Sequence, residues 1–189
     1  MRSLILHPTS TALWYALLNE AQQTCAIHLK EDIESYLVFL LMRFTDNPNV
    51  ASSVLGLEFL QGHQRLMNRQ YHHQLRDVGD KCLLYAGLFP GRAVKKRVKL
   101  SYFVRLGQSA YATLSHSLIT HEELFNKLQN EFVRMTDVLQ AMREQSDPTL
   151  DLLQSLEHWH DTGSQRAWQR IQQATGALPV LHDPKKSVH

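Results

Sequence analysis

Apolar residues recur along most of this chain at the spacing of one face of an α-helix. This spacing predicts helices over residues 12–28, 31–45, 50–63, 64–88, 101–117, 121–142, 148–159 and 165–175. No segment shows the strict alternation of a half-buried strand. The chain has 30 leucines against 11 valines and 5 isoleucines, and straight side chains lose less rotamer freedom in helices than β-branched ones. We therefore predict an all-α protein, a single-domain bundle of about seven or eight helices.

Two of these helices carry features that predict how they pack. The helix over residues 31–45 is apolar on all sides, which predicts a central position in the bundle. Gly79 interrupts the helix over residues 64–88, although a glycine there costs about 0.5–1 kcal/mol relative to alanine. We expect Gly79 to mark a close crossing with the helix over residues 101–117, whose small residues also permit close approach.

Capping residues predict where the last helices begin. Thr120 and Glu123 have the spacing of a capping box, so one uninterrupted helix is expected to follow them. Asp147 and Pro148 have the pattern of an N-cap and a first helical residue, which predicts the start of the next helix. Ser164 is expected to cap the final helix. In the helix expected to begin at Pro148, the apolar residues at helical spacing are Leu152, Leu153, Leu156 and Trp159.

Length and composition favour one folded domain over residues 1–175 and an extended or disordered tail over residues 176–189. The longest apolar run has seven residues, far fewer than the ~20 of a membrane-spanning helix. The first residues lack the apolar region of a signal peptide. Cys25 and Cys82 lie far apart and are expected to be reduced core residues. These features predict a cytoplasmic, bacterial-type soluble protein without a transmembrane segment.

Charge is distributed unevenly along the chain. The net charge is +2, yet residues 61–119 carry ten Lys or Arg against two Asp or Glu. The segments on either side each have a net charge of −3. One interpretation is that the basic residues form ordinary ion pairs with those acidic segments. The other is a basic face that contacts an anion, such as a phosphate group, through Arg65, Arg69, Arg76, Arg92, Lys95, Lys96, Arg97 and Lys99.

Two aspartates, Asp77 and Asp80, lie three residues apart within one expected helix. If they were buried with Tyr85 and Tyr111, they would form a carboxylate and tyrosine pocket between that helix and the next. Such a pocket would suit a small ligand or catalysis, because burial and neighbouring charges shift the pKa of a carboxylate. Alternatively, each aspartate pairs with the basic residue four positions away, and the tyrosines are ordinary core residues.

Motifs of common enzymes are missing, since there is no nucleophile elbow, dinucleotide fingerprint or phosphate-binding P-loop. Glu157 and His160 have the spacing seen in di-iron bundles, but a second copy is missing. His160 and Asp161 resemble the paired ligands of helical HD-type phosphohydrolases, whose later aspartate has no good counterpart here. We therefore predict neither a metal nor a cofactor. Sequence-specific nucleic-acid binding is not expected, because no helix-turn-helix pattern is evident and the basic stretch lacks interleaved aromatic residues.

Several short motifs lie between residues 30 and 140: Glu34-Ser35-Tyr36-Leu37, Arg76-Asp77-Val78-Gly79-Asp80-Lys81-Cys82-Leu83, Leu88-Phe89-Pro90, Ser101-Tyr102-Phe103 and Leu106-Gly107-Gln108-Ser109-Ala110-Tyr111. In these motifs the chain resembles a bacterial family of uncharacterised all-helical proteins. The resemblance implies a helical fold and no particular activity.

Two hypotheses about function follow from these patterns. The favoured one is a non-enzymatic binding or interaction module, whose basic face over residues 65–99 contacts a protein partner or a phosphate-bearing ligand. The alternative is a small-ligand-binding protein or enzyme that uses the carboxylate and tyrosine pocket. The apolar content also leaves room for a homodimer interface.

Overall fold

A computed structural model describes residues 9–46, 69–91, 98–118, 121–144 and 150–176. The regular structure of these residues is entirely helical, and their eight helices form one bundle-like body, which confirms the predicted all-α class. The helices are α1 (Ser10–Cys25), α2 (Glu31–Asp46), α4 (Arg69–Leu88), α6 (Leu100–Ser117), α7 (Glu122–Asn130), α8 (Phe132–Glu144), α9 (Leu152–Thr162) and α10 (Gln165–Thr175).

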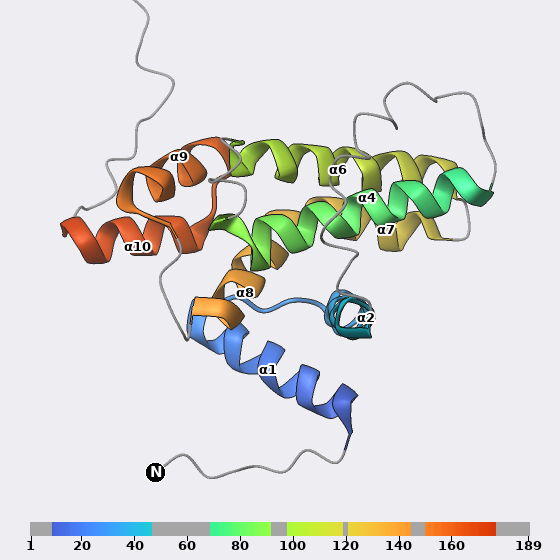
Figure 1. The fold of residues 1–189 in the computed structure, drawn as a ribbon, viewed down its shortest axis with the longest axis horizontal. Helices are drawn as coiled ribbons and strands as arrows, with labels where there is room; N and C mark the ends of the chain where they lie inside the picture. Colours follow the sequence, from blue (N-terminus) through green and yellow to red (C-terminus); the bar gives the residue numbers. More distant parts are fainter. Residues whose placement is uncertain (1–8, 47–68, 92–97, 119–120, 145–149, 177–189) are drawn as a thin grey trace, which may run out of the picture.

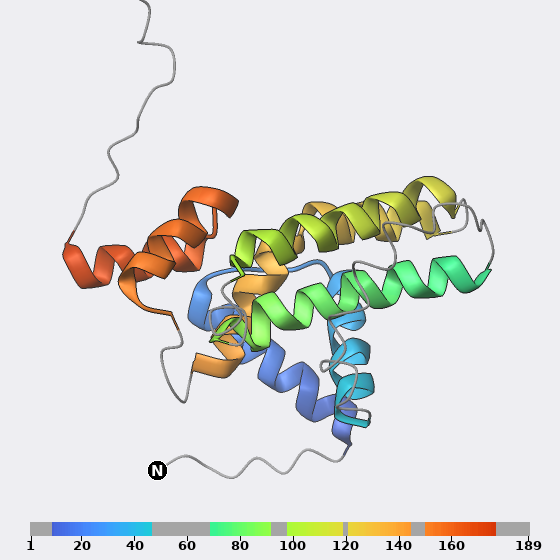
Figure 2. The same ribbon diagram turned by 45° about the horizontal axis from the view of Figure 1, so that its top comes forward.

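The two long helices α4 and α6 lie side by side and antiparallel along the long axis of the molecule (Figure 1). Helix α7 packs against α6, whereas α8 packs against both α4 and α1. Helices α9 and α10 form a hairpin at one end of the body, where α9 contacts α6 (Figure 2). The core therefore lies where α4, α6 and α8 meet, and α1 and α2 cover it from one side.

Glycines allow α4 and α6 to approach closely. A Cβ atom at Gly79 of α4 would collide with the ring of Tyr111 on α6. A Cβ atom at Gly107 of α6 would collide with the ring of Phe132, at the start of α8. The close crossing predicted at Gly79 is therefore confirmed.

The helix predicted as one uninterrupted segment after residue 120 is divided in two, so this prediction is wrong. Helix α7 ends at Asn130 and α8 begins at Phe132, with Glu131 between them. The Glu131 backbone departs from helical geometry, with φ −88° and ψ 5°, although helical hydrogen bonds still run from the Glu131 amide to the Lys127 carbonyl and from the Met135 amide to the Glu131 carbonyl. No helix-breaking residue marks this turn in the sequence. The change of direction brings α8 against α4 and α1, where it buries apolar side chains.

The start of α9 also differs from the prediction. The helix begins at Leu152 instead of near Pro148, because Asp151 is its N-cap. The Asp151 carboxylate accepts from the Gln154 amide at 2.8 Å, and the Gln154 side chain accepts from the Asp151 amide at 3.2 Å. This reciprocal pair is a capping box. Ser164 caps α10 as predicted, since its hydroxyl accepts from the Ala167 amide at 3.1 Å.

Helix α2 is not central, in contrast to the prediction from its apolar surface. It packs against α1 and α7, and its Phe39 is 61 % exposed. The helices α4, α6 and α8 each contact several others, whereas α2 lies at the side of the bundle (Figure 2). An apolar surface on all sides therefore does not identify the most buried helix here.

Some predictions fall outside the described residues, namely the helix over residues 50–63, the Thr120 cap and most of the C-terminal tail. Cys25 and Cys82 are both buried and free, as predicted for reduced core residues. None of the helices in the described ranges combines the length and apolarity that crossing a membrane requires.

Candidate functional site

Asp80 lies in the middle of α4 with its side chain completely buried, at 0 % exposure. Two tyrosine hydroxyls donate hydrogen bonds to its Oδ1 atom. Tyr36 of α2 donates at 2.5 Å, and Tyr111 of α6 donates at 2.7 Å. One carboxylate oxygen thus connects three helices.

Two arginines bring positive charge to the other carboxylate oxygen, Oδ2. Arg43 of α2 donates a hydrogen bond to it from Nη2, and the Nε atom of Arg76 lies 3.7 Å away. The pair between Asp80 and Arg76 was predicted from their spacing and is confirmed. Arg43 also lies 3.9 Å from the Asp77 carboxylate. The positive charges of the two arginines therefore equal the negative charges of Asp77 and Asp80 in this cluster.

The tyrosine hydroxyls of this cluster are permanent donors. Burial, together with the negative charge of Asp80, raises the pKa of Tyr36 and of Tyr111. Both hydroxyls stay protonated at neutral pH and keep donating to Asp80. The arrangement holds three helices together, because both oxygens of the α4 carboxylate already accept hydrogen bonds from donors on α2 and α6.

The predicted carboxylate and tyrosine pocket is only partly assembled. Asp80 and Tyr111 bond directly, but the Asp77 side chain is half exposed on the outside of α4. Tyr85 lies further along α4 and stacks on Phe103 of α6, with the ring centres 5.4 Å apart. These positions support the interpretation that the aspartates and tyrosines are paired structural residues.

Only Arg76 and Lys99 of the predicted basic face have side chains that the structure describes. Arg76 lies against Asp80, and the Lys99 ammonium lies 3.6 Å from the Glu157 carboxylate of α9. Both therefore form ion pairs with acidic residues, as the interpretation of ordinary ion pairs predicts. Anion contact by the whole face stays a prediction, because the structure does not describe the side chains of its other members: Arg65, Arg69, Arg92, Lys95, Lys96 and Arg97.

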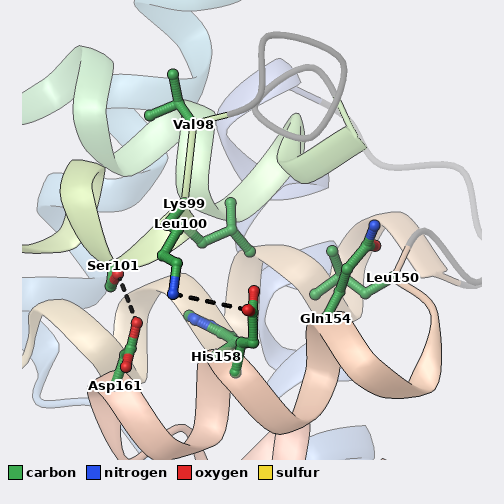
Figure 3. Close-up of a pocket in the computed structure, with 9 residues that line it drawn as sticks. Val98, Lys99, Leu100, Ser101, Leu150, Gln154, His158 and Asp161 are labelled. Atoms are coloured by element: carbon green, nitrogen blue, oxygen red, sulfur yellow. Dashed lines mark hydrogen bonds and ion pairs between the residues drawn. The ribbon is translucent and has the colours of Figure 1, made fainter.

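A pocket of about 230 Å³ lies between the start of α6 and the inner side of α9 (Figure 3). Its α6 wall presents Lys99 and Ser101, and its α9 wall presents Glu157, His158 and Asp161. The Ser101 hydroxyl donates to the Asp161 carboxylate at 2.9 Å. Hydrogen bonds from His160 and from Ser101 lower the pKa of Asp161, which keeps it ionised. The remaining lining residues are Val98, Leu100, Leu150 and Gln154.

His158 carries an unpartnered acceptor at this pocket. The residue is 3 % exposed, and its buried Nε2 atom has no hydrogen-bond partner. The Thr162 hydroxyl donates to the His158 carbonyl at 2.5 Å and lies 3.4 Å from Nδ1, so it can only accept from Nδ1. With the ring proton on Nδ1, the neutral ring has its lone pair on Nε2. Burial lowers the pKa of His158 to about 4, so the ring is neutral at pH 7.

A second buried carboxylate, Asp137 of α8, connects α8 to the start of α10. It accepts a hydrogen bond from the Ser164 hydroxyl at 2.6 Å and one from the Arg166 amide at 3.3 Å. Burial raises the pKa of Asp137 to about 6. Its contacts are all at a helix N-terminus, where a carboxylate is stabilising, so Asp137 is a capping residue.

The outer side of α9 carries exposed apolar side chains together with the exposed ring of His160. Leu153 is 67 % exposed, and Trp159 packs against Trp168 of α10 with the ring centres 4.6 Å apart. The buried side of the same helix carries Ser155 and His158 instead. The apolar residues at helical spacing thus mark the outer face of α9, whose exposed members are Leu152, Leu153, Leu156 and Trp159.

Within the described part of the chain, no three His, Cys, Asp or Glu side chains are placed to hold a metal ion. Glu157 pairs with Lys99, and the exposed His160 ring lies 3.2 Å from Asp161. Comparison of the chain with protein-family models, with curated proteins and with solved structures found no match.

The sequence did not identify Tyr36, Arg43 or His158 as members of these clusters. Tyr36 lies in an apolar stretch and looks like a core aromatic residue, whereas Arg43 looks like a helix-end cation. His158 lies on the side of α9 opposite its apolar residues. That position indicates burial only once the apolar residues are known to face outward.

Proposed function

We propose that this protein is a non-enzymatic interaction module that binds a partner through the outer face of α9. The observation that carries this proposal is the exposed stripe of apolar side chains there. Leucines and a tryptophan on one helical face are costly to leave in water, and such faces are typical of helix-binding surfaces. A buried Asp80 carboxylate that is already paired with arginines also favours binding over catalysis.

The charge beside the stripe indicates the chemistry of the partner. Successive helical residues are rotated by about 100°, which places Glu157 and then Asp161 next to Leu153, at one edge of the apolar stripe. The Glu157 side chain is half exposed. An apolar surface with an acidic border fits an amphipathic helix with apolar residues on one face and Lys or Arg beside them. We therefore assign a basic amphipathic helix of a partner protein as the occupant.

A second copy of this chain fits the same surface less well. Two α9 helices that pack face to face would bring their own acidic borders, each with Glu157 and Asp161, toward one another. Like charges at an interface are unfavourable, whereas a basic helix would place opposite charges there.

The test uses two synthetic helical peptides of about five turns, each with leucines on one face. One carries lysines on its other face, and the matched control carries glutamates. Binding to the full chain is measured by the fluorescence of its tryptophans and by calorimetry. We expect the lysine peptide to bind at least about tenfold more tightly, and Leu153→Ser with Leu156→Ser to weaken that binding at least about tenfold.

Phe39→Ser is the control variant, because Phe39 is an exposed apolar residue of α2 far from the stripe in sequence. It should leave peptide binding unchanged. Equal binding of both peptides, or binding that survives both leucine substitutions, contradicts the proposal. Light scattering gives the other decisive result: a wild-type dimer that the leucine variant dissociates would make a second copy the occupant.

A further inference from the structure

We propose that the pocket between α6 and α9 binds a free aliphatic α-amino acid as its zwitterion. This site lies on the inner side of α9, whereas the proposed partner surface lies on the outer side, and Glu157 and Asp161 lie between the two. Its two polar walls come from different helices and differ in hydrogen-bonding character (Figure 3).

The α9 wall is a set of acceptors suited to an ammonium group. His158 Nε2 is buried, carries a lone pair and lacks a partner, which is costly unless a ligand donates to it. The carboxylates of Glu157 and Asp161 line the same wall and supply negative charge. An ammonium group has three N–H donors and no acceptor, so it can satisfy these groups together.

The α6 wall offers donors and positive charge suited to a carboxylate. Lys99 is the N-cap residue of α6, and as a lysine it brings donors and a positive charge to the pocket. With it, the first-turn residues Leu100 and Ser101 line the pocket, at the positive end of the helix dipole. A ligand carboxylate placed here would interact with the Lys99 ammonium and with the helix terminus.

The spacing of the two walls favours an α-amino acid over a longer zwitterion. The Lys99 ammonium lies only 3.6 Å from the Glu157 carboxylate, so the positive and negative ends of the pocket are adjacent. In an α-amino acid the ammonium and carboxylate are likewise carried by one carbon atom. Apolar residues complete the lining and fit an aliphatic side chain, and they are Val98, Leu100 and Leu150.

The first experiment compares three small compounds that differ by one charged group. L-leucine has both groups, 3-methylbutylamine lacks the carboxylate, and 4-methylpentanoate lacks the ammonium. Binding to the full chain is measured by NMR titration, including the ¹⁵N shift of His158 Nε2. We expect L-leucine to move that shift, and each analogue to bind at least about tenfold more weakly, because each loses a charged hydrogen-bonding group.

The second experiment removes the acceptor. His158→Phe keeps an aromatic ring but has no Nε2, and it should weaken L-leucine binding at least about tenfold. His73→Phe, at an exposed position of α4, is the matched control and should bind as wild type does. Thermal unfolding shows whether His158→Phe is folded, and if it is not, the three-compound comparison on the wild type decides alone.

Three results would overturn the proposal. The first is an absence of L-leucine binding, the second is an analogue that binds as tightly as L-leucine, and the third is full binding by a folded His158→Phe variant. None of them depends on the peptide experiment, so this site and the partner surface of α9 are tested separately.

Discussion

Replacing Asp80 by asparagine removes one charge from the centre of the bundle while keeping the size of the side chain. In its better orientation the amide oxygen takes the place of Oδ1 and still accepts from Tyr36 and Tyr111. The amide nitrogen then takes the place of Oδ2 and points its N–H groups at Arg43, which is itself a donor. The variant therefore loses its ion pairs and one charge-assisted hydrogen bond.

The magnitude follows from the exposure of the partners. A hydrogen bond to a charged group contributes about 1.5–3 kcal/mol. The side chains of Arg43 and Arg76 are 38 % and 42 % exposed, so water screens their attraction to the carboxylate and the ion pairs add only about 1 kcal/mol. We expect Asp80→Asn to lower the free energy of unfolding by about 2.5–4 kcal/mol, a large share of the roughly 5–15 kcal/mol of an ordinary domain.

Urea unfolding at neutral pH, followed by circular dichroism, measures this loss. Asp77→Asn is the matched control, because Asp77 lies one turn earlier on α4 with a 53 % exposed side chain. It should change the free energy of unfolding by less than about 0.5 kcal/mol. Equal effects of the two substitutions, or an Asp80→Asn variant as stable as the wild type, would refute the reasoning.

Two further substitutions test the packing and the capping. Gly79→Ala should destabilise by about 1–3 kcal/mol, because the added Cβ meets the Tyr111 ring, and an unchanged melting temperature would contradict the close crossing. Burial raises the pKa of Asp137 from 3.8 to about 6, so the folded state holds a proton that the unfolded state releases between these pH values. Wild-type stability should therefore fall by about 3 kcal/mol as pH rises through this window. Asp137→Asn should lack that fall in urea titrations at several pH values, and parallel profiles would contradict the assignment.

The sequence predicted the class of fold and several local features well. Helical spacing, Gly79 and the Ser164 cap all reflect interactions within a few residues or a strong local preference, and each is present in the structure. The ion pair between Arg76 and Asp80 belongs to the same group, because residues four apart on a helix are neighbours.

Features that depend on distant contacts could not be predicted in this way. The break at Glu131 is marked by no helix-breaking residue, and the contacts of α8 with α4 and α1 join segments far apart in the chain. The outward stripe of α9 has the pattern of a buried face, so periodicity alone does not say that Ser155 and His158 face inward. The partners Tyr36 and Arg43 come from a helix about forty residues before Asp80, a distance that spacing rules do not cover.

The tyrosine and arginine contacts of Asp80 also affect the order in which the chain can fold. Its hydrogen-bond donors lie 44 positions before it, on α2, and 31 positions after it, on α6. A pair of α4 and α6 alone would bury the carboxylate with only Tyr111 and the neighbouring Arg76, and burying a charge with few partners is unfavourable. We therefore expect water to leave the α4–α6 interface around Asp80 together with the docking of α2.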